Sequence, residues 1–302
     1  MRAAAIFGPG CSAKDLKSFQ QNSEANWLID LPAASDQADA ILIFGGDGTV
    51  HRYLPQLVEL QIPVLVVPCG SGNDFARALG LRNSRDSLAV WHKFCSGSRN
   101  VRPIDLGVVT TSIVGQDAGG SSAPHYFCCV GGVGLDAEIA RRANRLPRWL
   151  RAHGGYIFSL LPALVRFASV ALKISMPRTE HQSALVARTA KPIMVTAFAN
   201  ASSYGGGMKI APHAQLDDGL LDICIINHMN KLKLFCLFPT VYLGRHLSVP
   251  QVDYFQAERI KLETEEPQDV YADGEYVCCT PIEVGVARGA LRVIVLEPAL
   301  RC

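Results

Sequence analysis

Several familiar signatures are missing from this sequence of 302 residues. No Gly-x-x-x-x-Gly-Lys-Ser/Thr run occurs, which excludes a P-loop nucleotide-binding protein. No Cys-x-x-Cys or His-x-x-x-His spacing occurs either, so we expect no zinc site. The ten cysteines are scattered, and two adjacent pairs lie inside apolar runs, which is typical of small buried side chains in a reducing compartment.

Charged residues are also scarce, at 19% of the chain with a formal net charge of +2, and no long block of like charge occurs. This composition does not indicate a nucleic-acid-binding protein, and we expect no nucleic-acid partner. Acidic residues are absent between Glu138 and Glu180. Arg141, Arg145 and Arg148 recur there at helical spacing, which fits either a solvated helix face or a site for phosphates or an anionic membrane surface.

Long hydrophobic segments are missing as well. The apolar run from Met1 to Phe7 is too short for a signal peptide. The longest apolar helix candidate, Tyr156 to Leu172, contains Pro162 and Arg166 and is too short to cross a bilayer. The sequence therefore predicts a cytoplasmic protein, and it leaves open a transient, peripheral contact with the inner face of a membrane.

The length of the chain predicts two domains, because 302 residues exceed what one hydrophobic core usually serves. Strands and helices alternate over residues 1–105, which predicts a Rossmann-like α/β domain with a parallel sheet. The strands expected there are residues 3–7, 27–31, 40–44 and 63–68, with helices over residues 13–21 and 50–60.

Residues 106–302 instead carry many short apolar strands with turns between them, which predicts a β-sandwich domain. One long helical insertion, roughly residues 135–171, is expected to interrupt these strands. The Gly- and Ser-rich segment 114–124 is expected to form a hairpin tip. The predicted strands are residues 125–133, 171–175, 193–199, 220–226, 259–263, 269–271 and 291–296.

The most informative stretch follows the third predicted strand and reads Gly45-Gly46-Asp47-Gly48-Thr49-Val50. Glycines permit a positive φ and leave no Cβ between backbone N–H groups and a phosphate, and the next residues can begin a helix whose N-terminus favours negative charge. A carboxylate beside phosphates needs a cation between them, so Asp47 indicates a metal-bridged nucleotide. The simpler alternative is a strand-to-helix turn capped by Asp47.

A second glycine loop follows the fourth predicted strand and contains Gly70, Ser71, Gly72 and Asn73 before Asp74. Ligands of parallel sheets bind beyond the carboxyl ends of the strands, so two such loops can face each other across one ligand. By itself the second loop is equally well explained as a plain connection in which Asn73 or Asp74 caps a helix.

Taken in order with two later stretches, these loops make the chain resemble the diacylglycerol kinase catalytic domain family, which includes bacterial lipid kinases and sphingosine kinases. The later stretches are residues 200–222, with Tyr204-Gly205-Gly206-Gly207-Met208 and Asp217-Asp218-Gly219-Leu220-Leu221-Asp222, and the turn Asp273-Gly274-Glu275. The resemblance implies an ATP-dependent lipid kinase with a nucleotide-binding α/β domain, a lipid-binding β-sandwich and an active site in the cleft between them.

The resemblance also implies roles for individual residues. Residues 45–50 would hold the ATP phosphates, and Gly70, Ser71, Gly72 and Asn73 would support the nucleotide. A magnesium loop would use the Asp218 carboxylate with the backbone carbonyls of Gln215 and Leu220, which suits a cation that prefers oxygen ligands.

The acceptor lipid would meet the downstream residues. Glu275 or Asp273 would act as base toward the lipid hydroxyl, while Asp47 with magnesium would hold the γ-phosphate. Asp136 matches a position that contacts the acceptor head group in sphingosine kinases, and Arg141 and Arg145 are further substrate candidates.

Two departures from the family pattern lie near the predicted nucleotide. Phe7-Gly8-Pro9-Gly10-Cys11-Ser12 lacks the asparagine of the usual Asn-Pro-x-Ser-Gly, and residues 27–41 leave room for a strand but hardly for a helix. A catalytically silent lipid- or nucleotide-binding protein therefore stays open as an alternative. An NAD kinase-like enzyme is a second alternative, because that family shares the Gly-Gly-Asp-Gly-Thr loop. A homodimer is a further open option.

Overall fold

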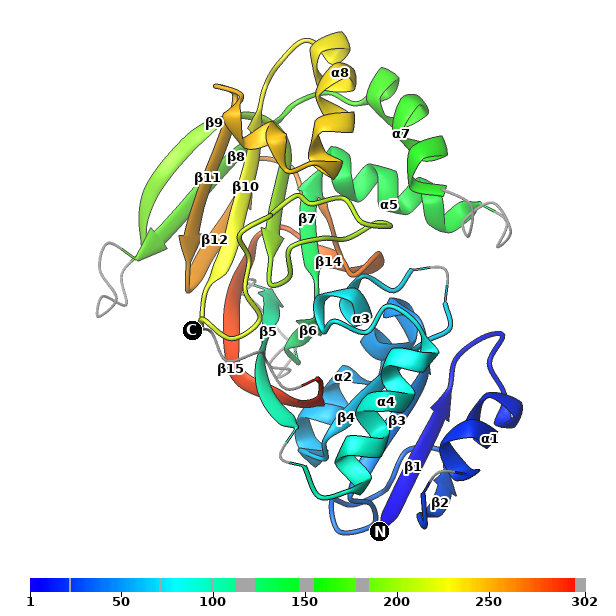
Figure 1. Cartoon of the computed structure of the whole chain (residues 1–302). Helices are drawn as coiled ribbons and strands as arrows, with labels where there is room; N and C mark the ends of the chain where they lie inside the picture. Colours follow the sequence, from blue (N-terminus) through cyan, green and yellow to red (C-terminus); the bar gives the residue numbers. More distant parts are fainter. Residues whose placement is uncertain are drawn as a thin grey trace. The chain divides into compact units, whose positions relative to one another are not determined.

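The computed structural model describes residues 1–21, 23–70, 72–98, 100–111, 123–146, 155–177 and 185–296 (Figure 1). It divides into two units, Met1–Asp105 with Arg288–Cys302, and Leu106–Ala287. The predicted second domain extended to residue 302, whereas the chain from Arg288 on groups with the first unit. The predicted segment 114–124 falls mostly on residues 112–122, which lie outside the described residues.

A parallel sheet forms the core of the first unit. Its strands are β1 (Arg2–Phe7), β2 (Asn26–Ile29), β3 (Ala40–Gly45) and β4 (Val64–Pro68), in the order β2-β1-β3-β4. Every residue of β3 is buried, as expected for a central parallel strand covered on both faces. The end of β15 (Ile282–Ile294) joins the sheet in parallel beside β4, through Val293 and Val64.

The helices of the first unit are α1 (Ala13–Gln21), α2 (Asp47–Leu60), α3 (Asp74–Ala78) and α4 (Ser84–Cys95). Helix α2 begins at Asp47 rather than at the predicted Val50, so the glycine loop runs directly into the helix. No helix occurs between β2 and β3, where all residues are described, as the short spacing predicted. The α/β class of this half is confirmed.

Antiparallel strands build the second unit. They are β5 (Val101–Thr111), β6 (His125–Phe127), β7 (Val130–Gly134), β8 (Val170–Pro177), β9 (Leu185–Ala199), β10 (Leu221–Asn227), β11 (Val252–Ala257), β12 (Arg259–Thr264), β13 (Asp269–Ala272) and β14 (Glu275–Cys279). The strands β14, β13, β7, β9, β8, β12 and β15 are neighbours in that order, and β10 pairs with β9 on one side and β11 on the other. Phe127, Phe198 and Ile223 belong to the buried core of this unit, in agreement with the predicted sandwich.

Helices interrupt the second unit at two places, not one. The predicted insertion contains α5 (Leu135–Arg145) and α7 (Gly155–Arg166), with residues 147–154 outside the described ranges. The sequence prediction missed α8 (Lys231–Tyr242) and a short 3-10 turn, η1 (Arg245–Ser248). The reason is that α8 is rich in aromatic and apolar residues without a clear helical period, although the Asn230 side chain caps it by accepting from Leu232 N. Across the described part of the chain, no helix combines the length and apolar character needed to span a membrane.

Candidate functional site

The two glycine loops meet at the carboxyl edge of the parallel sheet, as the sequence predicted. The Cys69 N–H donates to Gly45 O at 3.1 Å, and the Asp47 N–H donates to Gly72 O at 3.1 Å. The loop after β1 joins them, because the Gly8 N–H donates to Phe44 O at 2.7 Å. Three strand ends thus converge on one edge.

Close backbone packing explains the glycines of these loops. None of the described glycines at positions 45, 46, 48, 70 and 72 has a positive φ, so the expected use of left-handed conformations is wrong here. A Cβ on Gly70 would instead lie 2.6 Å from the Gly46 Cα, and a Cβ on Gly46 would overlap the Gly72 carbonyl oxygen. The glycines let the two loops touch backbone to backbone.

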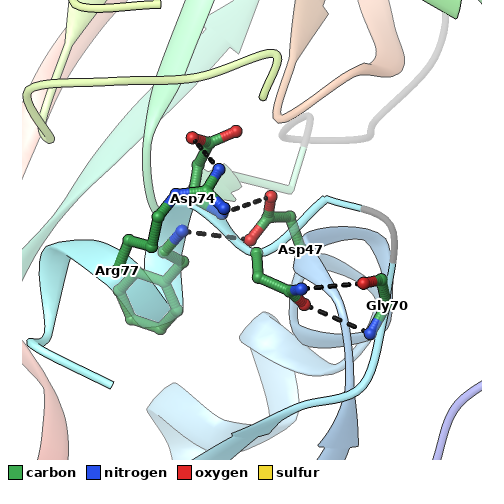
Figure 2. A network of polar contacts seen from close by, with 6 residues as sticks. Asp47, Gly70, Asp74 and Arg77 are labelled. Atoms are coloured by element: carbon green, nitrogen blue, oxygen red, sulfur yellow. Dashed lines mark hydrogen bonds and ion pairs between the residues drawn. The ribbon is translucent and has the colours of Figure 1, made fainter. Parts of the chain in front are cut away.

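The carboxylate of Asp47 ties the second loop to the first. Asp47 Oδ2 accepts from the Asp74 N–H and Asp47 Oδ1 from the Phe75 N–H, each at 3.0 Å (Figure 2). Asp47, the first residue of α2, therefore caps the neighbouring helix α3. Its negative charge faces the start of α3, where unpaired backbone N–H groups carry positive partial charge.

The second loop is held in shape by Asn73. Its side-chain amide donates to Gly70 O at 2.7 Å, and its side-chain oxygen accepts from the Gly70 N–H at 3.2 Å (Figure 2). Asp74 is buried and forms a 2.6 Å ion pair with Arg77. The remaining predicted member of this loop, Ser71, lies outside the described residues.

The N-terminus of α2 is the feature of this edge best suited to an anion. Gly46 is its N-cap and supplies no side-chain hydrogen bond to the first turn, and Gly48 in that turn is exposed. A helix of 14 residues carries positive partial charge at this end, which favours an anion. The N–H groups of Asp47, Thr49 and Val50 already donate to backbone carbonyl oxygens, of Gly72 for Asp47 and of Gly46 for the other two.

In the second unit, Asp273 lies in the turn between β13 and β14, and Glu275, the other predicted base, is the first residue of β14. Asp273 and Gly274 have φ values of 50° and 82°, the signature of a two-residue hairpin loop of type I′. The Asp273 carboxylate accepts from the backbone N–H groups of Cys128 and Cys129, at 2.7 and 2.8 Å. Both Asp273 oxygens therefore hold the chain at the start of β7, whereas Glu275 is exposed.

Asp136 is a buried carboxyl in the first turn of α5, where it accepts a 2.5 Å hydrogen bond from the Tyr204 hydroxyl. Burial raises the pKa of Asp136 to about 6, and the hydrogen bond from Tyr204 opposes that rise. Tyr204 stands in the sequence motif 204–208, for which no role of this residue was predicted. The feature of the sequence that could have pointed to Tyr204 is the glycine run that follows it. Gly205, Gly206 and Gly207 all have positive φ and fold a tight loop.

Arg141 lies on α5 beside a cavity of about 730 Å³ in the second unit, but its charge is paired. Glu138 accepts from Arg141 at 2.5 Å and from Arg142 at 2.6 Å. Arg145 is exposed in the last turn of α5 and is not among the cavity residues. The cavity is lined by Gly134 at the end of β7, by residues 137, 138, 141 and 142 of α5, by residues 166–171 and by residues 265–269.

Besides the exposed Asp217, the predicted magnesium loop brings two carboxylates close together, those of Asp218 and of Asp222 at the start of β10. Asp218 Oδ1 accepts from the Leu220 N–H at 3.0 Å, and Gln256 reaches both Asp218 and the buried Asp222, at 3.4 and 3.2 Å. Burial raises the pKa of Asp222, and the charge of Asp218 adds to that rise. Gln215 is exposed at the same loop.

A hard cation fits this donor set, because it would relieve the repulsion between the two carboxylates and bind oxygen atoms. No cluster of three or more His, Cys, Asp or Glu side chains is placed to hold a metal within the described ranges, so backbone oxygens and water would have to complete the shell. Asp222 stands in the sequence motif without a predicted role, and Gln256 was not predicted at all, because β11 aligns Gln256 opposite Asp222 only in the folded sheet.

Comparison with known proteins agrees with this layout. Residues 15–109 match the diacylglycerol kinase catalytic domain, and residues 130–295 match the YegS C-terminal NAD kinase beta sandwich-like domain. A diacylglycerol kinase of Mycobacterium tuberculosis is 32% identical over 268 residues, covering 87% of this chain and 78% of the relative. A diacylglycerol kinase of Bacillus subtilis is 30% identical over 246 residues, covering 81% and 73%.

Solved structures share the fold at lower identity. A diacylglycerol kinase structure from Bacillus anthracis aligns with a TM-score of 0.66 and 18% identity, covering 99% of this chain and 98% of that one. An NAD kinase from Archaeoglobus fulgidus aligns with a TM-score of 0.54 and 13% identity, covering 98% and 94%. The resemblance carried by the glycine loops and the later motifs is confirmed: the chain belongs to the diacylglycerol kinase catalytic domain family and is a lipid kinase.

Proposed function

We propose that the protein transfers the γ-phosphate of ATP to the hydroxyl of a diacylglycerol-like or sphingoid lipid, with magnesium as cofactor. The observation that carries the proposal is the pair of interlocked glycine loops at the start of α2, in a chain 32% identical to a diacylglycerol kinase. Phosphoryl transfer depends mainly on positioning and charge neutralisation, which rigid backbone donors can supply.

The first unit would bind the nucleotide. Residues 45–50 would hold the phosphates at the positive end of the α2 dipole, and Gly70, Gly72 and Asn73 would shape the loop beside them. The contacts of Asp47 with α3 support a further role: its carboxylate fixes one loop against the other, and so sets the spacing in which phosphates would fit.

Magnesium would neutralise phosphate charge and orient the bound nucleotide. In the second unit, Asp218 and the carbonyls of Gln215 and Leu220 would hold such an ion, with Asp222 close to Asp218. The hydrogen bonds from Gln256 and Tyr254 to Asp222 keep this carboxylate oriented.

The second unit would also present the acceptor. Glu275 is the better of the two predicted bases, because its carboxylate is exposed, whereas both oxygens of Asp273 accept backbone hydrogen bonds. Glu275 would accept the proton of the lipid hydroxyl. Asp136 and Arg141 would contact the acceptor, and Arg141 lies at the edge of the 730 Å³ cavity. The exposed Arg145 would attract the anionic membrane surface around the acceptor.

With this activity the protein would work in the cytoplasm, in transient contact with a membrane that supplies the lipid, and would serve phospholipid metabolism. A homodimer is compatible with the proposal but contributes nothing to it.

An acceptor panel tests the proposed function. Purified protein would be incubated with labelled ATP, with and without magnesium, and with diacylglycerol or a sphingoid base in micelles, or with NAD in solution. We expect magnesium-dependent label in a lipid. Label in NAD would favour the NAD kinase alternative, and ATP binding without transfer to any acceptor would favour a silent protein.

A further inference from the structure

Helices α7 and α8 of the second unit lie against each other, although 64 residues of sequence separate their ends. The Lys231 ammonium, at the start of α8, donates to the Val165 carbonyl in the last turn of α7 at 2.7 Å. Figure 1 shows the two helices next to each other in this unit, with α5 beside α7. They therefore form one surface.

Large apolar side chains gather on this surface. Leu161 and Val165 of α7 are 55% and 64% exposed, and Leu232 and Phe235 of α8 are 71% and 45% exposed. Their spacings of four and three residues put each pair on one side of its helix. Other residues of both helices, namely Leu160, Ala163, Leu164, Leu234, Leu237 and Val241, are buried and already serve the core.

The charged side chains that α7 and α8 themselves carry are all basic, and Arg166 also lines the cavity that Glu138, Glu265, Glu266 and Asp269 border. Arg166, Lys231 and Lys233 are exposed beside them. No aspartate or glutamate occurs in residues 139–179 or 223–252, which include both helices. Apolar side chains bordered by basic ones match a surface that is apolar within and negatively charged outside, which describes an anionic bilayer.

We propose that the α7–α8 face, defined as Leu161, Val165, Leu232 and Phe235 with Arg166, Lys231 and Lys233, docks on an anionic lipid bilayer. The four apolar side chains enter the boundary between head groups and acyl chains, and the basic side chains bind the head groups. Neither helix is long enough to span, so both lie along the surface. The proposal rests on the proposed function, because a kinase for a bilayer lipid must reach its substrate there.

Vesicle flotation of the full chain tests the face. The vesicles contain phosphatidylcholine with or without phosphatidylserine, and no nucleotide is present. We expect binding that depends on phosphatidylserine and falls by tenfold or more in the Leu232→Ser/Phe235→Ser variant, since about two large side chains leave the bilayer. Arg166→Gln/Lys233→Gln should weaken binding by about tenfold or more, and salt should do the same.

The matched control is Leu28→Ser/Ile29→Ser, which removes two apolar side chains of similar exposure, 40% and 55%, from β2 of the first unit. It should bind vesicles like the wild type. A second face variant, Leu161→Ser/Val165→Ser, changes α7 alone, so weaker binding in this variant cannot result from a local folding defect in α8. The unfolding midpoints of all variants should match that of the wild type.

Two results would overturn the proposal. One is equal vesicle binding by wild type and face variants. The other is a wild type that elutes as a dimer while the face variants elute as monomers without loss of vesicle binding, which would assign the face to a second copy. The proposed function fails separately, if vesicle binding depends on the face but no lipid hydroxyl is phosphorylated.

Discussion

Replacing Asp47 with asparagine removes one acceptor from the contact that joins the glycine loops. In the wild type each carboxylate oxygen accepts one backbone N–H of α3 at 3.0 Å. Asparagine keeps one oxygen, but its amide group would face the other N–H, donor against donor. A hydrogen bond to a charged group contributes about 1.5–3 kcal/mol, so we expect the free energy of unfolding of the first unit to be about 2–3 kcal/mol lower in Asp47→Asn than in the wild type.

Urea denaturation followed by tryptophan fluorescence measures this loss. Trp27 and Trp91 lie in the first unit with ring centroids 5.6 Å apart, so a Trp149→Phe background would make the signal report on that unit. A loss of about 2–3 kcal/mol corresponds to a midpoint lower by about 1 M or more. Affinity for ATP should fall with it, because the spacing of the loops would no longer be fixed.

The control is Asp36→Asn, which removes the same charge from an exposed turn of the same unit. It should leave the midpoint unchanged. A midpoint for Asp47→Asn equal to that of Asp36→Asn would refute the assignment of Asp47 as the contact that holds α3.

Three further predictions concern other residues of the site. Gly70→Ala would place a Cβ 2.6 Å from the Gly46 Cα, so we expect the free energy of unfolding to fall by about 1–3 kcal/mol and ATP binding, measured by calorimetry, to weaken. The control is Gly285→Ala, whose added Cβ would meet only ordinary contacts. Full ATP affinity in Gly70→Ala would contradict the loop packing. Asp273→Asn should lower the urea midpoint of the second unit, because one of two backbone hydrogen bonds is lost, while Glu275→Gln in the same hairpin should not; equal midpoints would contradict the clamp. The pKa of Asp136 is about 6 in the folded state, against an ordinary value of 3.8, so the folded protein keeps this proton to a higher pH than the unfolded chain does. The contribution of the protonated carboxyl to the free energy of unfolding is therefore full below about pH 4, and about 3 kcal/mol of it is lost as the pH rises to about 6. Tyr204→Phe removes the bond that lowers this pKa, so a carboxyl NMR titration should move to higher pH; an unchanged titration would remove Tyr204 from the pair.

Much of the fold followed from local patterns. The apolar run of β3 breaks into glycines, and this alone predicted a strand, a loop and a helix start at one sheet edge, all of which the structure contains. The resemblance of the motifs in order then led to the right family. Helix α8 escaped because its aromatic and β-branched residues suit strands as well as helices.

The uses of the acidic side chains could not be predicted, because their partners are distant in sequence. Asp47 bonds residues 27 and 28 positions away, and Asp273 bonds residues 144 and 145 positions away. No local pattern distinguishes such a clamp from a free catalytic carboxylate. The return of β15 to the first sheet is non-local in the same way, since Val293 pairs with Val64.

The central claim is that Glu275, and not Asp273, accepts the proton of the lipid hydroxyl in an ATP-dependent kinase. The most direct test is single-turnover transfer of labelled γ-phosphate from magnesium ATP to diacylglycerol or a sphingoid base, with wild type and Glu275→Gln compared. We predict label in the lipid with the wild type and a rate about 100-fold lower in Glu275→Gln at an unchanged unfolding midpoint. An undiminished rate in Glu275→Gln, or no lipid label with the wild type although ATP is bound, would contradict the claim.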